Sequence, residues 1–176
     1  MESTTIYRSN ASDILSEKIF KTAGNLKDYV FLCIGTSGVV SDSLGPKVGS
    51  LLMSDDNFSL LIYGTEEINV NAKNMSIAIE FVKTMHPDKK IVVVDAAVGD
   101  STEVGCVQVV NDGIVPGAAT NKVLPRVGDV SLLGVVSMRG AQNFYSAKAD
   151  RVELVDKMAY VIAESVKKSV NNFLAC

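Results

Sequence analysis

Short continuous apolar runs alternate with amphipathic stretches along most of this chain. The amphipathic stretches carry apolar residues at three- and four-residue spacings, the pattern of helices packed on one side. They predict helices at 11–23, 46–53, 72–85 and 151–173. The continuous runs are typical of strands that are buried on both faces. They predict strands at 30–35, 59–63, 90–94, 105–110 and 130–138.

The order of these elements predicts the topology of the sheet. Strand, helix, strand, helix and strand follow one another up to residue 94, which favours parallel pairing with right-handed crossovers. Residues 97–104 are too few for a crossover helix, so we expect the strand 105–110 to be antiparallel to a neighbour. Residues 111–128 contain several glycines and prolines and predict an irregular loop.

Together these patterns predict one domain over residues 1–176, of the α/β class. Helices on both faces of the sheet make it a three-layer α/β/α arrangement. The sheet is expected to be mostly parallel but mixed, with about five strands.

Two aspartates follow apolar runs and are the leading candidates for chemistry. Asp42 comes shortly after the run 30–35, and Asp95 directly ends the run 91–94. In a doubly wound sheet of order 2-1-3, the first and third strands are neighbours and ligands bind beyond their carboxyl ends. We therefore expect both carboxylates in one crevice. Two close carboxylates can share a proton, which suits hydrolysis by acid and base.

Structural roles are the alternative for both residues. Asp42 is equally well explained as a cap of the helix that follows, although Ser43 can fill that cap. Asp95 could accept backbone N–H bonds from the loop 96–99. A charge at the edge of a buried sheet is costly unless it is paired, which favours a functional role for Asp95.

Four further residues are candidates for contact with a substrate. Ser43 adjoins Asp42, and Glu66 follows the second strand and could border the same crevice. Lys122 and Arg126 lie in the long loop, where they could orient a substrate carbonyl or carboxylate. Solvated surface charge is the alternative interpretation of Glu66, Lys122 and Arg126.

Composition argues against several classes of function. The net charge of −3 provides no basic excess to replace the counterions of nucleic acid. The three cysteines are isolated, which indicates free thiols rather than a disulfide framework or a thiolate zinc site. His86, the sole histidine, lies in a turn that is predicted at the opposite end of the sheet from Asp95, so neither a histidine zinc site nor a Ser-His-Asp triad is expected. We expect no cofactor and no zinc or nickel, although two aspartates could hold a hard cation.

The amino terminus also bears on location. Residues 1–5 are polar, without the basic and apolar regions of a signal peptide. The longest apolar runs fall well short of the roughly 20 residues that a membrane helix needs. We expect a protein of the cytoplasm, not bound to a membrane.

Several motifs of the chain resemble the small sporulation protein family related to the spore germination protease. The likeness runs from about residue 29 to about residue 164. The Pro-Gly and Lys-x-Leu-Pro-x-Val-Gly-Asp stretches are specific, whereas the isolated Gly-Thr pairs are not. The motifs are Ile34-Gly35-Thr36, Asp42-Ser43-Leu44-Gly45-Pro46-Lys47-Val48-Gly49, Tyr63-Gly64-Thr65, Val94-Asp95-Ala96-Ala97-Val98-Gly99, Val115-Pro116-Gly117-Ala118, Lys122-Val123-Leu124-Pro125-Arg126-Val127-Gly128-Asp129 and Leu133-Gly134-Val135-Val136.

This resemblance implies the fold of the germination protease, which is similar to that of hydrogenase maturation proteases. It implies that Asp42 and Asp95 are the essential pair of a peptidase and that small acid-soluble spore proteins are its substrates. The alternative is a catalytically inactive binding or assembly protein of sporulation that keeps the protease fold. The loop Ser37-Gly38-Val39-Val40-Ser41 favours that alternative, because the family usually has Asp-Arg-Ser-Thr-Gly there. The oligomeric state is left open.

Overall fold

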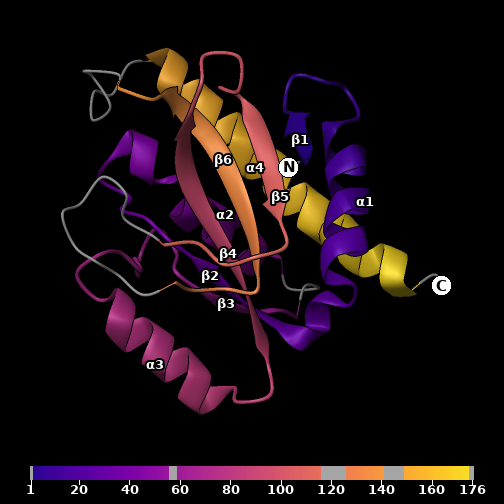
Figure 1. The fold of residues 1–176 in the computed structure, drawn as a ribbon, viewed down its shortest axis with the longest axis vertical. Coiled ribbons are helices and arrows are strands. Elements are labelled where there is room, and N and C mark those ends of the chain that lie inside the picture. The colour runs from indigo at the N-terminus through magenta and orange to yellow at the C-terminus, as the bar shows by residue number, and fades with distance from the viewer. Residues whose placement is uncertain (1, 56–58, 116–125, 141–148, 175–176) are drawn as a thin grey trace.

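The computed structural model describes residues 2–55, 59–115, 126–140 and 149–174. Within these ranges the chain forms one six-stranded sheet and four α-helices (Figure 1). The strands are β1 Glu2–Thr5, β2 Tyr29–Cys33, β3 Leu61–Tyr63, β4 Lys90–Gly99, β5 Cys106–Val110 and β6 Val130–Met138. The helices are α1 Ala11–Ala23, α2 Leu44–Met53, α3 Met75–Met85 and α4 Ala149–Leu174, with short 3₁₀ turns η1 Leu26–Asp28 and η2 Val40–Asp42.

The strands lie in the order β1-β5-β6-β4-β2-β3. The strands β3, β2, β4 and β6 are parallel, while β5 is antiparallel to β6 and β1 is antiparallel to β5. The predicted 2-1-3 order is therefore confirmed in β3-β2-β4, and so is the antiparallel strand near 105–110. The sheet has six strands rather than about five, because β1 also joins it. Its sequence, Glu-Ser-Thr-Thr, is polar and has no strand-like apolar pattern, since β1 is an edge strand.

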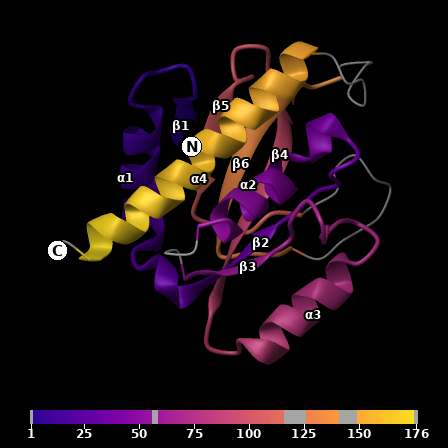
Figure 2. The same ribbon diagram turned by 180° about the vertical axis from the view of Figure 1, so that it is seen from behind.

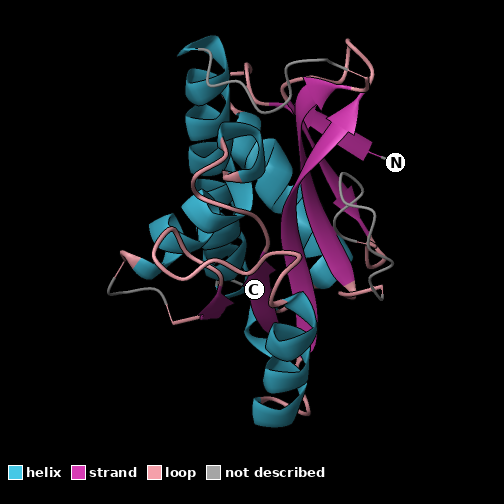
Figure 3. Cartoon of the chain, turned by 90° about the vertical axis from the view of Figure 1, so that its left-hand side faces the viewer, coloured by secondary structure: helices cyan, strands magenta, loops and turns pink. Residues whose placement is uncertain are grey.

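Helices cover both faces of the sheet, as the apolar runs predicted. The helices α1, α2 and α4 lie on one face, with α4 running diagonally past the other two (Figure 2), whereas α3 lies on the opposite face. Seen from the side, the sheet stands against the larger helical layer (Figure 3). The larger core contains the buried stripe of α4, whose three- and four-residue spacings are those of a helix packed on a sheet: Val155, Met158, Ala159, Ile162 and Val166.

Three helices begin at residues other than those predicted, and one of them is α4, which begins at Ala149 rather than at residue 151. The helix α2 begins at Leu44 rather than at residue 46, so Pro46 lies within the first turn, where a missing N–H costs nothing. The helix α3 begins at Met75 rather than at residue 72. Before it, the Asn71 N–H donates to Asn74 Oδ1 at 2.8 Å, and this local turn takes the place of the first helical turn.

The strand β4 is longer than its apolar run. It continues to Gly99, so Asp95 lies within the strand rather than at its end, which corrects the prediction. The pairing with β2 stops at Cys33 and Val94, whereas the pairing with β6 continues from Asp95 to Gly99. A neighbouring strand can prolong a ladder of backbone hydrogen bonds without any apolar side chain. Asp95 is therefore the first residue of β4 beyond the end of β2.

Among the described residues, no helix combines the length and the apolar character that crossing a bilayer requires.

Candidate active site

Asp95 carries a carboxyl group in the interior of the protein. The residue is only 9% exposed, and its Oδ1 accepts the Ala96 N–H at 2.8 Å. Burial and, second to it, the nearby charge of Asp42 raise the pKa of Asp95 from 3.8 to about 8, while the Ala96 N–H lowers it. A carboxyl group with a pKa of about 8 holds its proton at neutral pH, so Asp95 can serve as a proton donor.

Asp42 ends the 3₁₀ turn η2 and is half-buried. Its backbone is fixed on both sides: the Asp42 oxygen accepts the Thr36 N–H at 2.9 Å, and the Asp42 N–H donates to Val39 O at 2.8 Å. Burial raises the pKa of the Asp42 carboxyl, while hydrogen bonds from the Thr36 side chain and backbone lower it. Thr36 therefore favours the charged form of Asp42, the form that a general base needs.

Two glycines let the elements around Asp42 approach one another closely. Gly35 has a φ of +145°, and a Cβ there would meet the Asp42 carbonyl oxygen at 1.9 Å. A Cβ on Gly45 would lie 2.1 Å from Ile34 O and 2.8 Å from Val94 O. Because neither position has room for a side chain, these glycines bring the loop and the start of α2 onto the end of β2 and onto β4 at Val94. This is a physical reason for the Ile-Gly-Thr and Leu-Gly-Pro motifs.

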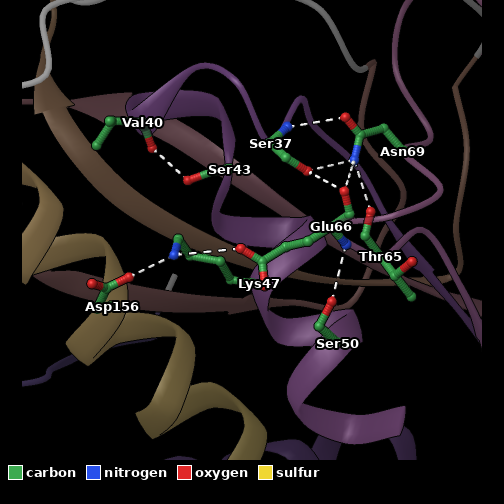
Figure 4. Close-up of polar contacts among 9 residues, drawn as sticks. All are labelled: Ser37, Val40, Ser43, Lys47, Ser50, Thr65, Glu66, Asn69 and Asp156. Carbon is green, nitrogen blue, oxygen red and sulfur yellow. Dashed lines mark hydrogen bonds and ion pairs between the residues drawn. The ribbon is translucent and has the colours of Figure 1, made fainter. Parts of the chain in front are cut away.

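Ser43 lies beside Asp42 but faces the protein interior. It is 1% exposed, and its hydroxyl donates to Val40 O at 2.9 Å (Figure 4). Ser43 occupies the position before α2, yet its side chain makes no capping hydrogen bond there, which corrects the expectation that it fills the cap. Its φ and ψ of −89° and 0° are already close to helical, whereas a capping serine usually has extended backbone.

Glu66 lies at the rim of this region and is exposed. Its N–H donates to Ser50 Oγ at 2.9 Å, and its Oε1 lies 3.5 Å from Lys47 Nζ. Lys47 also pairs with Asp156 of α4 at 2.8 Å (Figure 4). No role of Lys47 is evident from its residue type alone, although it belongs to the Asp42–Gly49 motif, and that membership is the signal that could have indicated one. Lys47 thus links α2, α4 and the loop after β3.

The two basic candidates of the long loop have different outcomes. Arg126 is paired with Asp112 rather than brought to Asp42 and Asp95. Its Nη1 donates to Asp112 Oδ2 at 2.6 Å and to Gly113 O at 2.7 Å. These contacts support the antiparallel bridge between Ile114 and Val127. Lys122 lies outside the described residues.

The sole histidine is located away from the aspartates, before the amino end of β4. His86 ends α3 in the turn that precedes β4, and its Nε2 lies 2.8 Å from Tyr63 Oη. The Cys33 thiol is buried, which raises its pKa to about 12 and makes it unreactive. In the described parts of the chain, no three His, Cys, Asp or Glu residues form a group that could hold a metal ion.

The fold defines the structural class first. The chain resembles a [NiFe] hydrogenase maturation protease, HycI, from Thermococcus kodakarensis KOD1, with a TM-score of 0.53 and 18% sequence identity. The match covers 88% of this chain and 99% of HycI. An uncharacterized protein from Wolinella succinogenes is more distant, with a TM-score of 0.43 and 14% identity over 83% of this chain and 98% of the other. The chain therefore has a maturation-protease-like α/β fold.

The sequence then defines the family. Residues 3–165 match the family described as "Protein of unknown function (DUF1256)", and the chain belongs to this family. It is 37% identical over 153 residues to the uncharacterized protein YyaC of Bacillus subtilis (strain 168). That match covers 87% of this chain and 74% of YyaC. The resemblance found in the motifs is thus confirmed as a YyaC-like relationship on a protease fold.

Proposed function

We propose that this protein is a peptidase-like hydrolase in which Asp42 and Asp95 activate water. One observation carries the proposal. Asp95, on β4 just beyond the end of β2, is a buried carboxyl whose pKa is raised to about 8, in part by the charge of Asp42. Titratable groups whose pKa values are shifted in this way are typical of catalytic sites. The maturation-protease-like fold and the YyaC relationship are consistent with it.

In the proposed reaction the two aspartates have different tasks. Asp42, whose charged form accepts the hydrogen bonds of Thr36, takes a proton from water as the water oxygen attacks the peptide carbonyl. The tetrahedral intermediate then collapses with breakage of the C–N bond, and Asp95 supplies its proton to the departing nitrogen. The proton on Asp42 passes to Asp95 and restores the starting state, so protons balance over one cycle.

The substrate we propose is a protein, and the class that the family resemblance implies is the small acid-soluble spore proteins. Glu66 is exposed and pairs with Lys47 of the Asp42–Gly49 motif, where it could contact such a substrate. Arg126 would act only if the bound substrate drew it from Asp112 to the site, and Ser43 would act through the turn that holds Asp42. Lys122 remains a proposed contact of the substrate. We place the reaction in the cytoplasm or the forespore, without a membrane or nucleic acid as a partner.

The test is incubation with purified small acid-soluble spore proteins, followed by mass spectrometry of the products. We expect Asp95→Asn and Asp42→Asn to lower the cleavage rate by about 10²- to 10⁴-fold, the usual worth of general acid–base catalysis. Asp88→Asn in the exposed turn before β4 is the matched control and should cleave like the wild type. Equal cleavage by wild type and Asp95→Asn would contradict the proposal.

A second candidate, a non-catalytic binding or assembly protein of sporulation, is favoured by the loop before Asp42. In that loop Val40 packs against the larger core, and the Val40 backbone oxygen accepts the Ser43 hydroxyl. These residues are engaged in structure rather than presented to a substrate. For this function we expect the spore proteins to bind without cleavage and with an affinity that Asp95→Asn does not change.

A further inference from the structure

Asn69 lies in the loop between β3 and α3, yet its side chain bonds to the loop that follows β2. Its Oδ1 accepts the Ser37 N–H at 3.0 Å, and its Nδ2 donates to Ser37 Oγ at 2.6 Å. The same Nδ2 donates to Thr65 O at 2.7 Å, and the Ser37 hydroxyl donates to Glu66 O at 3.0 Å (Figure 4). One amide group thus joins two loops that are 32 residues apart in the sequence.

Backbone contacts continue this link toward Asp42. The Gly35 N–H donates to Val70 O at 2.8 Å, so the residues on either side of Thr36 are both tied to the loop after β3. Thr36 in turn donates its N–H to the Asp42 backbone oxygen at 2.9 Å, and its hydrogen bonds lower the pKa of the Asp42 carboxyl. A displacement of Ser37 would therefore move the residue that holds Asp42.

The neighbouring asparagines provide a comparison. Asn71 Oδ1 accepts the Lys73 N–H at 3.0 Å, and Asn74 Oδ1 accepts the Asn71 N–H at 2.8 Å. Such short-range bonds stabilise the turn in which the residues themselves lie. Asn69 differs because its amide bonds to Ser37, far away in the sequence. The hydrogen bonds of Asn69 therefore do more than stabilise its own loop.

We propose that Asn69 is a positioning residue for Asp42: it fixes the Gly35–Ser37 segment so that Thr36 holds the Asp42 carboxylate beside Asp95. The assignment rests on the proposed function, because a general base must be held in a fixed place relative to the proton donor. Asn suits this task, since its amide both accepts and donates, whereas Ala can do neither and Asp cannot donate when ionised.

The first experiment is independent of any peptidase activity. Carboxyl-carbon NMR titrations of Asp42 and Asp95 are compared in the wild type, Asn69→Ala and the matched control Asn71→Ala. In Asn69→Ala, Asp42 is free to move away, which weakens its repulsion of a charged Asp95. We therefore expect the titration midpoint of Asp95 to fall in Asn69→Ala and to stay at the wild-type value in Asn71→Ala. An unchanged midpoint in Asn69→Ala would overturn the proposal.

The second experiment measures whether Asn69 and Ser37 act as one unit. Ser37→Ala removes the hydroxyl but keeps the backbone N–H that Asn69 accepts, so its effect on the Asp95 midpoint should be smaller. In the double variant we expect less than the sum of the two single effects, as contacting residues usually show. Strict additivity would contradict a common role.

If the wild type cleaves spore proteins, kcat should fall about 10- to 100-fold in Asn69→Ala with little change in KM. If the wild type cleaves nothing, the proposed function fails, while the titration still decides the role of Asn69.

Discussion

Two aspartates beside the same pair of strands, Asp95 and Asp129, have opposite environments. Asp129 stands at the start of β6, is exposed, and its Oδ2 accepts the Ile91 N–H at 2.8 Å. Its own N–H donates to Ile91 O at 2.8 Å, so Asp129 fastens β6 to β4 at their amino ends. Asp95 stands farther along β4, is buried, and makes its one described side-chain hydrogen bond to the adjacent Ala96 N–H.

The contrast shows what the position of a carboxylate in a sheet decides. Asp129 accepts the N–H of Ile91, the second residue of β4, and its exposed carboxyl group is open to water. Asp95 lies beyond the end of β2 and near the charge of Asp42, so it has no free strand end to satisfy, and only 9% of the residue is exposed to water. One aspartate serves the register of the sheet, whereas we propose a chemical role for the other.

The largest expected effect is the pH dependence of stability caused by Asp95. Its folded-state pKa of about 8 lies above the ordinary value of 3.8, so the folded protein binds this proton more tightly than the unfolded chain. The stabilisation is fully present below the ordinary pKa and is lost as the pH rises through about 8. At roughly 1.4 kcal/mol per pKa unit, the free energy that corresponds to this pKa difference exceeds the contribution of a single hydrogen bond to stability.

Asp95→Asn removes this titration while keeping shape. We therefore expect the melting temperature of Asp95→Asn, relative to wild type, to increase from about pH 4 to about pH 9 and to be unchanged or higher than wild type at pH 7. Thermal melts across this pH range measure it. Destabilisation of about 1 kcal/mol at neutral pH by both Asp95→Asn and Asp42→Asn would instead indicate that the two residues serve as loop caps.

A smaller effect is expected at the other aspartate. Asp129→Ala leaves the Ile91 N–H without its acceptor and should lower the free energy of unfolding by about 1 to 2 kcal/mol. Asp129→Asn keeps an acceptor oxygen and should lose less. Denaturant unfolding of the two variants measures both values, and cleavage should be unaffected. If Asp129→Ala lost activity at unchanged stability, the contrast between the two aspartates would be wrong.

The smallest effect concerns the rim of the site. Lys47→Met keeps the aliphatic stem but removes the ion pairs with Asp156 and Glu66, whose carboxylates are 51% and 46% exposed. Exposed pairs of this kind contribute about 1 kcal/mol or less and are weakened by salt. We expect a small loss of stability at low ionic strength that disappears at high salt. A loss above about 2 kcal/mol would show that Lys47 has a larger structural role than a rim ion pair.

Much of the fold was predictable because burial leaves a pattern in the sequence. The runs before residue 35 and before residue 95 are apolar because β2 and β4 are covered on both faces, and α4 shows the spacing of a helix with one buried side. Strand β1 could not be predicted in the same way, since it is an edge strand of polar residues that joins the sheet through backbone hydrogen bonds. Those bonds do not depend on side-chain identity and leave no pattern.

The candidate site divides in the same manner. Asp42, Asp95 and the glycines beside them were visible as motifs, because a carboxylate after a buried strand and a glycine at a close approach are unusual choices locally. The roles of Lys47 and Asn69 were not visible, because each bonds to residues far away in the chain. The interpretation of Ser43 as a cap was wrong, since the preceding turn uses its hydroxyl.

The sequence by itself determined which segments are buried, that the sheet is mostly parallel, and which two carboxylates follow the apolar runs of β2 and β4. The tertiary structure decided how the aspartates differ: β4 continues along β6 past the end of β2, and this places Asp95 inside the sheet while Asp42 stays in a loop held by Thr36. The physical reason is that desolvation and charge repulsion depend on distances between segments that are remote in the chain, and local patterns contain no such distances.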